Sequence, residues 1–175
     1  FPIAWAQLPN YESNRGDGWM LVREGMLKAA QAVPGAGMAV TLDAGEAKDI
    51  HPKDKQTVGA RLARWALSQV YKKGGAASGP WLTKHETRGA EIVVSFTHTG
   101  GGLVLKPGAE SGFVLAGADK VWHPATARIE GDTVVISSDA VKQPVAARYA
   151  WAEMAPVTLW NGEGLPASPF RTDDW

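Results

Sequence analysis

An aspartate at position 49 and a histidine at position 51 open the segment DIHPKDKQ (residues 49–56). An imidazole can take a proton from a nucleophile and return it to a leaving group, and a nearby carboxylate can hold the ring in the required orientation. The Asp-x-His spacing is equally compatible with a histidine whose ring nitrogen only stabilises a loop by a hydrogen bond. Whether the pair can act as an acid–base system depends on the elements that present it.

The segments on either side of this loop predict a strand and a helix. Residues 37–42 (GMAVTL) form an apolar, partly β-branched run that is typical of a buried strand. From about residue 54 to 71, apolar residues recur at helical spacing. His51 would therefore lie in a loop that leaves the carboxyl end of a strand and enters a helix, where open α/β sheets bind ligands.

The first part of the chain repeats the same order of elements. Residues 3–8 predict a strand that is closed by Pro9-Asn10, and residues 19–30 show a helical period. Strand, helix, strand, helix fits the crossover units of a parallel sheet. Two parallel strands leave edges and faces uncovered, so we expect further sequence upstream to complete this part.

Beyond the segment KKGGAASGP (residues 72–80), the sequence pattern changes. This segment is rich in small, turn-forming residues and predicts a boundary between two regions. Short β-branched or aromatic runs then alternate with turns, and Glu130-Gly131-Asp132 predicts a hairpin. Such spacing is typical of an antiparallel β-sandwich or jelly roll. The runs are residues 91–96, 103–105, 112–116, 127–129, 133–136 and 145–151.

Composition excludes several kinds of site and partner. Eighteen basic residues balance eighteen acidic ones, which argues against nucleic acid or an anionic membrane surface as a partner. The chain has no cysteine, so disulfides, thiolate metal sites and a cysteine nucleophile are excluded. No apolar run approaches the roughly 20 residues that cross a bilayer. His85, His98 and His123 follow no metal-ligand spacing, and we expect no metal site.

The sequence around His51 closely resembles the last catalytic block of sialate O-acetylesterases, members of the SGNH (GDSL-like) hydrolases. The resemblance lies in residues 38–43 and 49–62 and continues through residues 145–151 and 164–175. It implies that residues 1–73 are the C-terminal part of a flavodoxin-like three-layer α/β SGNH hydrolase domain. Residues 80–175 would form an antiparallel, jelly-roll-like β-sandwich domain with a C-terminal extension. A periplasmic or secreted location is suggested by this resemblance only.

The resemblance implies a carboxylic ester hydrolase that removes acetyl groups from sugars, such as sialic acid or acetylated xylan, through an acyl-serine and without a cofactor. His51 would serve as base and then acid, and Asp49 would orient it. The usual block of these hydrolases is Asp-x-x-His, whereas Lys48 stands three residues before His51. Asp43 is therefore a second candidate for the orienting carboxylate.

The nucleophile in this family is a serine in an N-terminal Gly-x-Ser-Asn-like block. Ser13 precedes an asparagine but lacks the glycine, and Ser68 lies within a predicted helix. The remaining serines belong to predicted turns or strands. We therefore expect the nucleophile to come from an N-terminal portion of the same enzyme, without which this chain would be inactive.

Two other interpretations stay open. The chain could be a carbohydrate-binding β-sandwich module, with a sugar-stacking platform formed by some of Trp81, Trp122, Trp151 and Trp160, although tryptophan in a β-sandwich is usually part of the core. It could also be a non-catalytic subunit or fragment that needs a partner half to fold.

Overall fold

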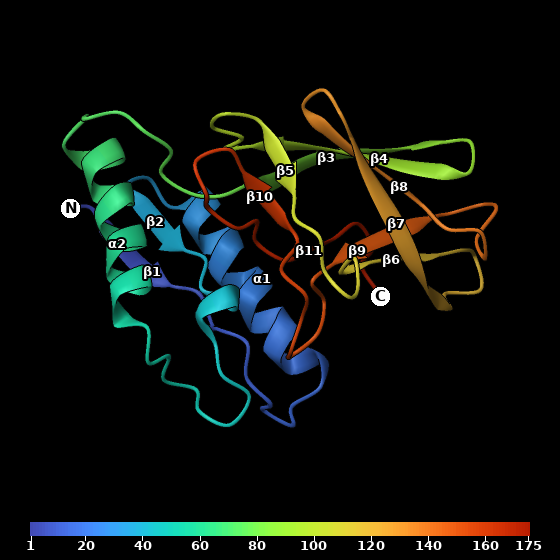
Figure 1. Ribbon diagram of the computed structural model, residues 1–175, viewed down its shortest axis with the longest axis horizontal. Helices are drawn as coiled ribbons and strands as arrows, with labels where there is room; N and C mark the ends of the chain where they lie inside the picture. Colours follow the sequence, from blue (N-terminus) through green and yellow to red (C-terminus); the bar gives the residue numbers. More distant parts are fainter.

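The computed structural model describes residues 1–175, and most of its regular structure is β (Figure 1). The α-helices are α1 (Asp17–Ala32) and α2 (Lys55–Trp65); a 3-10 turn (Leu42–Ala44) precedes α2, and a π-helical turn (Ala66–Val70) extends it. Neither α-helix has the length and hydropathy needed to cross a membrane. The strands are β1 (Ile3–Ala6), β2 (Ala36–Ala39), β3 (Trp81–Arg88), β4 (Glu91–Thr97), β5 (Leu103–Leu105), β6 (Phe113–Ala116), β7 (Trp122–Glu130), β8 (Thr133–Ser137), β9 (Ala146–Tyr149), β10 (Leu159–Asn161) and β11 (Phe170–Arg171).

Strands β1 and β2 pair in parallel, and both α-helices pack against β2. Gly37 in β2 permits the close approach of α2, because a Cβ atom at this position would lie 1.9 Å from Nε1 of Trp65. Helix α2 begins after Asp54, whose carboxylate accepts a hydrogen bond from the backbone N–H of Thr57 at 2.9 Å. These contacts fix the two ends of the segment that carries His51.

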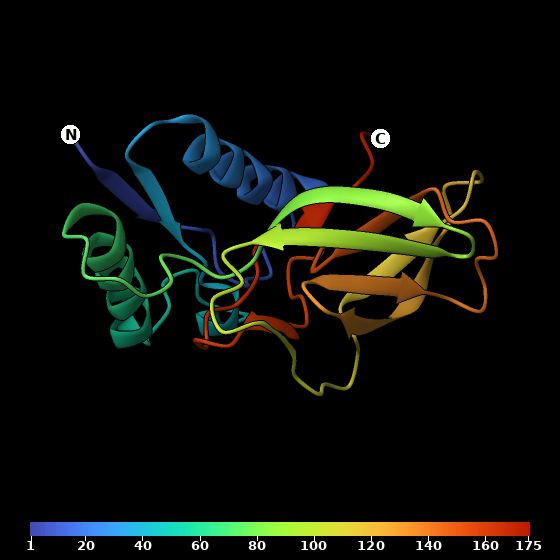
Figure 2. The same cartoon turned by 90° about the horizontal axis from the view of Figure 1, so that it is seen from above.

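The remaining strands form mainly one antiparallel sheet of seven strands, in the order β11-β9-β6-β7-β8-β4-β3. Strand β7 joins its two halves, because its first residues pair with β6 and its later residues pair with β8. The sheet curls until it is nearly closed: four strands lie between β4 and β11 in the order, yet the ring centroids of Phe96 in β4 and Phe170 in β11 are 5.6 Å apart. Figure 2 shows α2 at one end of the molecule and this sheet at the other.

A single hydrophobic core joins the helical end to the curled sheet. The largest cluster of buried side chains includes Leu27 of α1 and Met38 of β2 as well as Phe113 and Tyr149 of the sheet. The hydroxyl of Tyr149 accepts hydrogen bonds from the backbone N–H groups of Thr158 and Leu159, and burial raises its pKa to about 12. Apolar surface from both regions is thus removed from water together.

The predicted fold class, a three-layer α/β SGNH domain followed by an antiparallel β-sandwich, is wrong. The parallel part has only two strands, and seven of the antiparallel strands form one nearly closed sheet instead of two stacked ones, while β5 and β10 pair separately. Both helices, the parallel pair and the hairpin at residues 130–132 are confirmed, whereas strands β3, β10 and β11 were not predicted. The error lies in the pairing, because long-range strand order is not encoded in local periodicity. A division of the chain near residues 74–79 stays a prediction.

Candidate functional site

Asp49 and His51 lie in the loop between the 3-10 turn that follows β2 and the start of α2, as the sequence predicts. The Asp49 carboxylate accepts a hydrogen bond from the backbone N–H of His51 at 2.9 Å. The same Oδ1 atom lies 3.3 Å from Nδ1 of the His51 ring. The imidazole side chain is 82% exposed, so its remaining face is open to a ligand or to another segment of protein.

The electrostatics of the loop favour a charged Asp49. The backbone N–H of His51, followed by the His51 ring, holds the pKa of the Asp49 carboxyl below its usual value. Lys53 donates from its backbone N–H and from Nζ to the carboxylate of Glu46, which closes the loop around the pair. An ionised carboxylate can accept from Nδ1 of the ring and leave Nε2 for proton transfer.

Asp43, the other candidate for orienting His51, is paired with α2. Its two carboxylate oxygens accept from NH1 and NH2 of Arg61, both at 2.6 Å. The Arg61 side chain is only 9% exposed, and it also donates to the backbone carbonyl of Val40. A bidentate partner of this kind occupies both oxygens, so the geometry favours Asp49 as the partner of His51.

The two aspartates should respond differently to substitution. Asp49→Asn should lower kcat of acetyl ester hydrolysis by about tenfold or more, because an amide is a poorer partner for a charged imidazole than a carboxylate. Its melting temperature should stay close to that of the parent, because the side chain is partly exposed. Asp43→Asn should instead destabilise the fold by up to about 3–5 kcal/mol, because it leaves a buried guanidinium without its counter-charge.

Kinetics and thermal unfolding of both variants in the full-length protein check this assignment. A loss of kcat in Asp43→Asn at unchanged stability, with normal kcat in Asp49→Asn, would reverse the roles.

A depression of about 770 Å³ adjoins the loop. Its wall includes Ile50, the residue between Asp49 and His51, and the aromatic pair Tyr11 and Trp19, whose ring centroids are 5.6 Å apart. The depression thus brings together an apolar surface, aromatic edges and a guanidinium beside the loop of the candidate base. The lining residues are Leu8, Tyr11, Ser13, Arg15, Gly18, Trp19, Val22 and Ile50.

Glu153, from the loop after β9, holds one wall of this depression. Its carboxylate accepts from the hydroxyl of Ser13 and from the backbone N–H groups of Asn14, at 3.2 Å, and Arg15, at 2.9 Å. These contacts hold the pKa of Glu153 below its usual value, with the Ser13 hydroxyl as the largest cause. Ser13 is therefore engaged with Glu153 and not with His51.

Sequence reasoning did not single out Glu153 or Arg23, the buried arginine that supports the same loop. Glu153 lies about 140 residues from its partners along the chain. Arg23 fits a helical period and gives no local signal of its burial. Only the folded chain brings these residues to the site.

The other histidines lie apart from the loop. His85 is exposed on β3, and His123 lies on β7. His98 stacks on Trp81 with ring centroids 4.4 Å apart, and burial lowers its pKa.

The four tryptophans of the possible sugar platform divide into two pairs. Trp81 and Trp160 are buried at 8% and 9% exposure, as expected for core residues. Trp122 and Trp151 are half-buried.

Comparison with known proteins finds similarity to solved structures. No family model matches the chain, and no curated protein matches it. A carbohydrate acetylesterase from Xanthomonas citri is similar to this chain, with a TM-score of 0.91 and 42% sequence identity over 99% of the chain. The match covers 41% of that protein, so the present chain spans less than half its length. This chain is therefore similar in sequence and in structure to one part of a carbohydrate acetylesterase.

Proposed function

We propose that this chain is part of a carbohydrate O-acetylesterase of the sialate O-acetylesterase-like SGNH type, and that it supplies the base of the catalytic site. The observation that carries the proposal is the contact of Nδ1 of His51 with Asp49 in an exposed strand-to-helix loop. The similarity to a carbohydrate acetylesterase supports the same reaction class. The substrates would be O-acetylated sugars such as sialic acid or acetylated xylan.

The proposed reaction begins when Nε2 of His51 takes the proton of a serine hydroxyl, and the serine oxygen attacks the acetyl carbonyl carbon. The bond to the sugar oxygen breaks, and His51 returns the proton to that oxygen. A water molecule then loses a proton to His51 and attacks the acetyl-serine. Acetate leaves, and the serine regains its proton. Asp49 stabilises the imidazolium that forms in each half of the cycle, and no cofactor takes part.

We further propose that the serine comes from a segment outside these 175 residues. The ring of His51 has one polar partner, the carboxylate of Asp49. The hydroxyls of Ser111 and Ser138 donate to backbone carbonyls, and that of Ser13 donates to Glu153. The absence of a hydrogen bond between any serine hydroxyl of this chain and the His51 ring supports this proposal.

Labelling of the nucleophile tests this proposal. The full-length protein would be treated with a fluorophosphonate, which reacts covalently with activated serines, and the labelled peptide would be mapped by mass spectrometry. We expect one labelled serine, outside Phe1–Trp175, and loss of 4-nitrophenyl acetate hydrolysis in proportion to labelling. His51→Ala should abolish labelling. A label on any serine within the chain would contradict the proposed division of the triad.

A further inference from the structure

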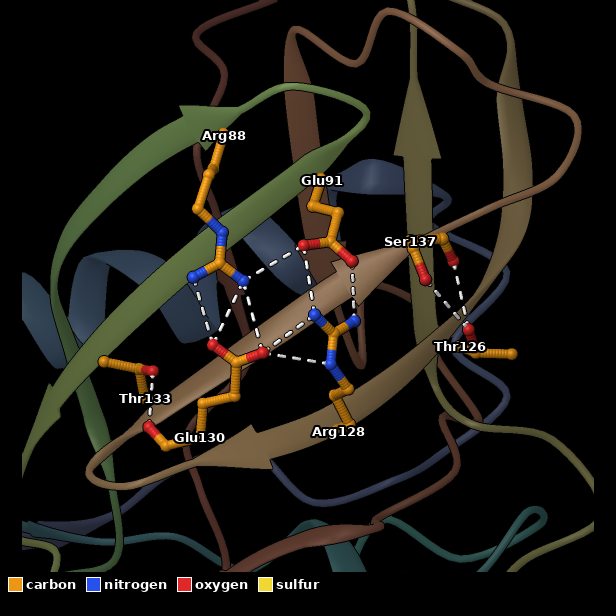
Figure 3. A network of polar contacts seen from close by, with 7 residues as sticks. All are labelled: Arg88, Glu91, Thr126, Arg128, Glu130, Thr133 and Ser137. Carbon is orange, nitrogen blue, oxygen red and sulfur yellow. Dashed lines mark hydrogen bonds and ion pairs between the residues drawn. The ribbon is translucent and has the colours of Figure 1, made fainter.

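A row of polar side chains crosses the solvent face of the antiparallel sheet, away from the His51 loop. Thr126 of β7 pairs in register with Ser137 of β8, which in turn pairs with Glu91 of β4. The hydroxyls of Thr126 and Ser137 lie 3.2 Å apart. Figure 3 shows these side chains projecting from adjacent strands on the same face. This face therefore offers hydroxyl and carboxylate groups at the spacing of neighbouring strands.

The charges on this face cancel. Glu91 accepts from Arg128 at 2.6 Å and from Arg88 at 3.0 Å, while Glu130 accepts from the same two arginines (Figure 3). The hydrogen bonds from Arg128, and then those from Arg88, lower the pKa of Glu91 to about 2. Two guanidinium groups thus balance two carboxylates, and this cluster has no net charge with which to attract a polyanion.

Three adjoining depressions form a groove beside this row. One of about 490 Å³ is lined by Glu91, Thr126, Ser137 and Ser138, among others. A second, of about 500 Å³, shares Pro124 and Thr126 with the first. A third, of about 450 Å³, shares Ala140 and Lys142 with the first. The shared residues place the three depressions next to one another along the sheet, an arrangement that suits an extended ligand more than a compact one.

Trp151 lies at one end of the groove, in the wall of the second depression. Its ring is approached by the guanidinium carbons of Arg148, at 5.4 Å, and Arg171, at 5.2 Å. Both arginines are fixed in turn, Arg148 by Asp173 and Arg171 by Glu24. The Trp151 side chain is therefore already ordered, so little conformational entropy would be lost when a ligand binds to it. Of the four candidate platform tryptophans, Trp151 is the one that lines this groove.

We propose that this groove is a non-catalytic binding site for a neutral polysaccharide chain. Sugar hydroxyls would exchange hydrogen bonds with Thr126 and Ser137, and an apolar sugar face would stack on Trp151. The groove is lined by four carboxylates and one lysine, which disfavours an anionic chain, and its length favours several consecutive sugar units. None of the residues that line it lines the depression at the His51 loop. The site would therefore work whether or not His51 is a catalytic base.

Affinity electrophoresis of the full-length protein in gels that contain a soluble neutral xylan tests the proposal. The xylan would be used acetylated and again after alkaline deacetylation. We expect both forms to retard the parent protein and His51→Ala equally. The double variant Thr126→Ala, Ser137→Ala should bind about tenfold more weakly, because it loses two hydrogen-bonding hydroxyls.

Thr133→Ala provides the matched control, because Thr133 lies on the same face of β8 but does not line the groove. It should be retarded like the parent. Equal retardation of the double variant and the parent would overturn the proposal, as would the absence of retardation by either xylan. Loss of binding in His51→Ala would also overturn it, because binding would then belong to the catalytic site.

Discussion

Replacing His51 with alanine should lower kcat/KM for acetyl ester hydrolysis by about a hundredfold to ten-thousandfold in the full-length protein, the range expected for loss of a general base. The fold should be almost unaffected, because the side chain is 82% exposed and its ring has one polar partner, Asp49. Surface substitutions of this kind change the free energy of unfolding by about 0.5 kcal/mol or less. Initial rates with 4-nitrophenyl acetate, together with thermal unfolding, separate the two effects.

His85→Ala is the matched control for this measurement. His85 is another exposed histidine, but it lies on β3 and does not line the depression beside the His51 loop. Its variant should keep the parental rate and the parental melting temperature. If His51→Ala turned over acetyl esters as fast as the parent, the assignment of His51 as the base would be wrong. An equal loss of rate in both variants would indicate a general effect of removing surface histidines.

The features that the sequence predicts well depend on short stretches of chain. Strand β4 and the hairpin at residues 130–132 follow from β-branched runs and a glycine turn. The approach of Asp49 to His51 follows similarly, because one residue separates them and a tight loop brings such neighbours together. Asp43 stayed an open alternative because its partner Arg61 lies 18 residues away, on α2.

The features that the sequence does not predict depend on contacts between distant segments. Strand β7 pairs with β6 at one end and with β8 at the other, so the strands form one curled sheet where the local pattern suggested a sandwich. The wall of the depression beside His51 is held by Glu153, far along the chain from the loop that it supports. Periodicity describes which face of an element is apolar, but not which other element covers that face.

Arg23 is the clearest case of a residue whose importance only the fold reveals. It lies on α1, its side chain is completely buried, and it has no carboxylate in direct contact. Its guanidinium donates to the backbone carbonyls of Leu8, Pro9, Ala152 and Glu153, at 3.0, 2.6, 2.8 and 3.2 Å. Burial lowers its pKa to about 10, which still leaves it charged at neutral pH. The arginine therefore ties the loop after β1 to the loop after β9.

Replacing Arg23 with methionine should destabilise the protein by about 3–5 kcal/mol, since four buried carbonyls would lose their donor. For a chain of this size, the melting temperature should fall by roughly 6–20 °C. The stability of Arg23→Lys should lie between those of the parent and Arg23→Met, because one ammonium cannot reach all the carbonyls that surround a planar guanidinium. Thermal and denaturant unfolding of the three proteins provide the measurement.

Arg15→Met serves as the control, because Arg15 is exposed and its guanidinium forms no salt bridge. It should unfold within about 0.5 kcal/mol of the parent. If the free energy of unfolding of Arg23→Met differed from that of the parent by less than 1 kcal/mol, water would have replaced the lost donors. The two loops would then be held by other contacts. If the prediction holds, Arg23→Met should also weaken ester hydrolysis at temperatures where it stays folded. The loop that Arg23 supports continues into Tyr11, which lines the depression beside His51, so a looser loop would position the substrate less well.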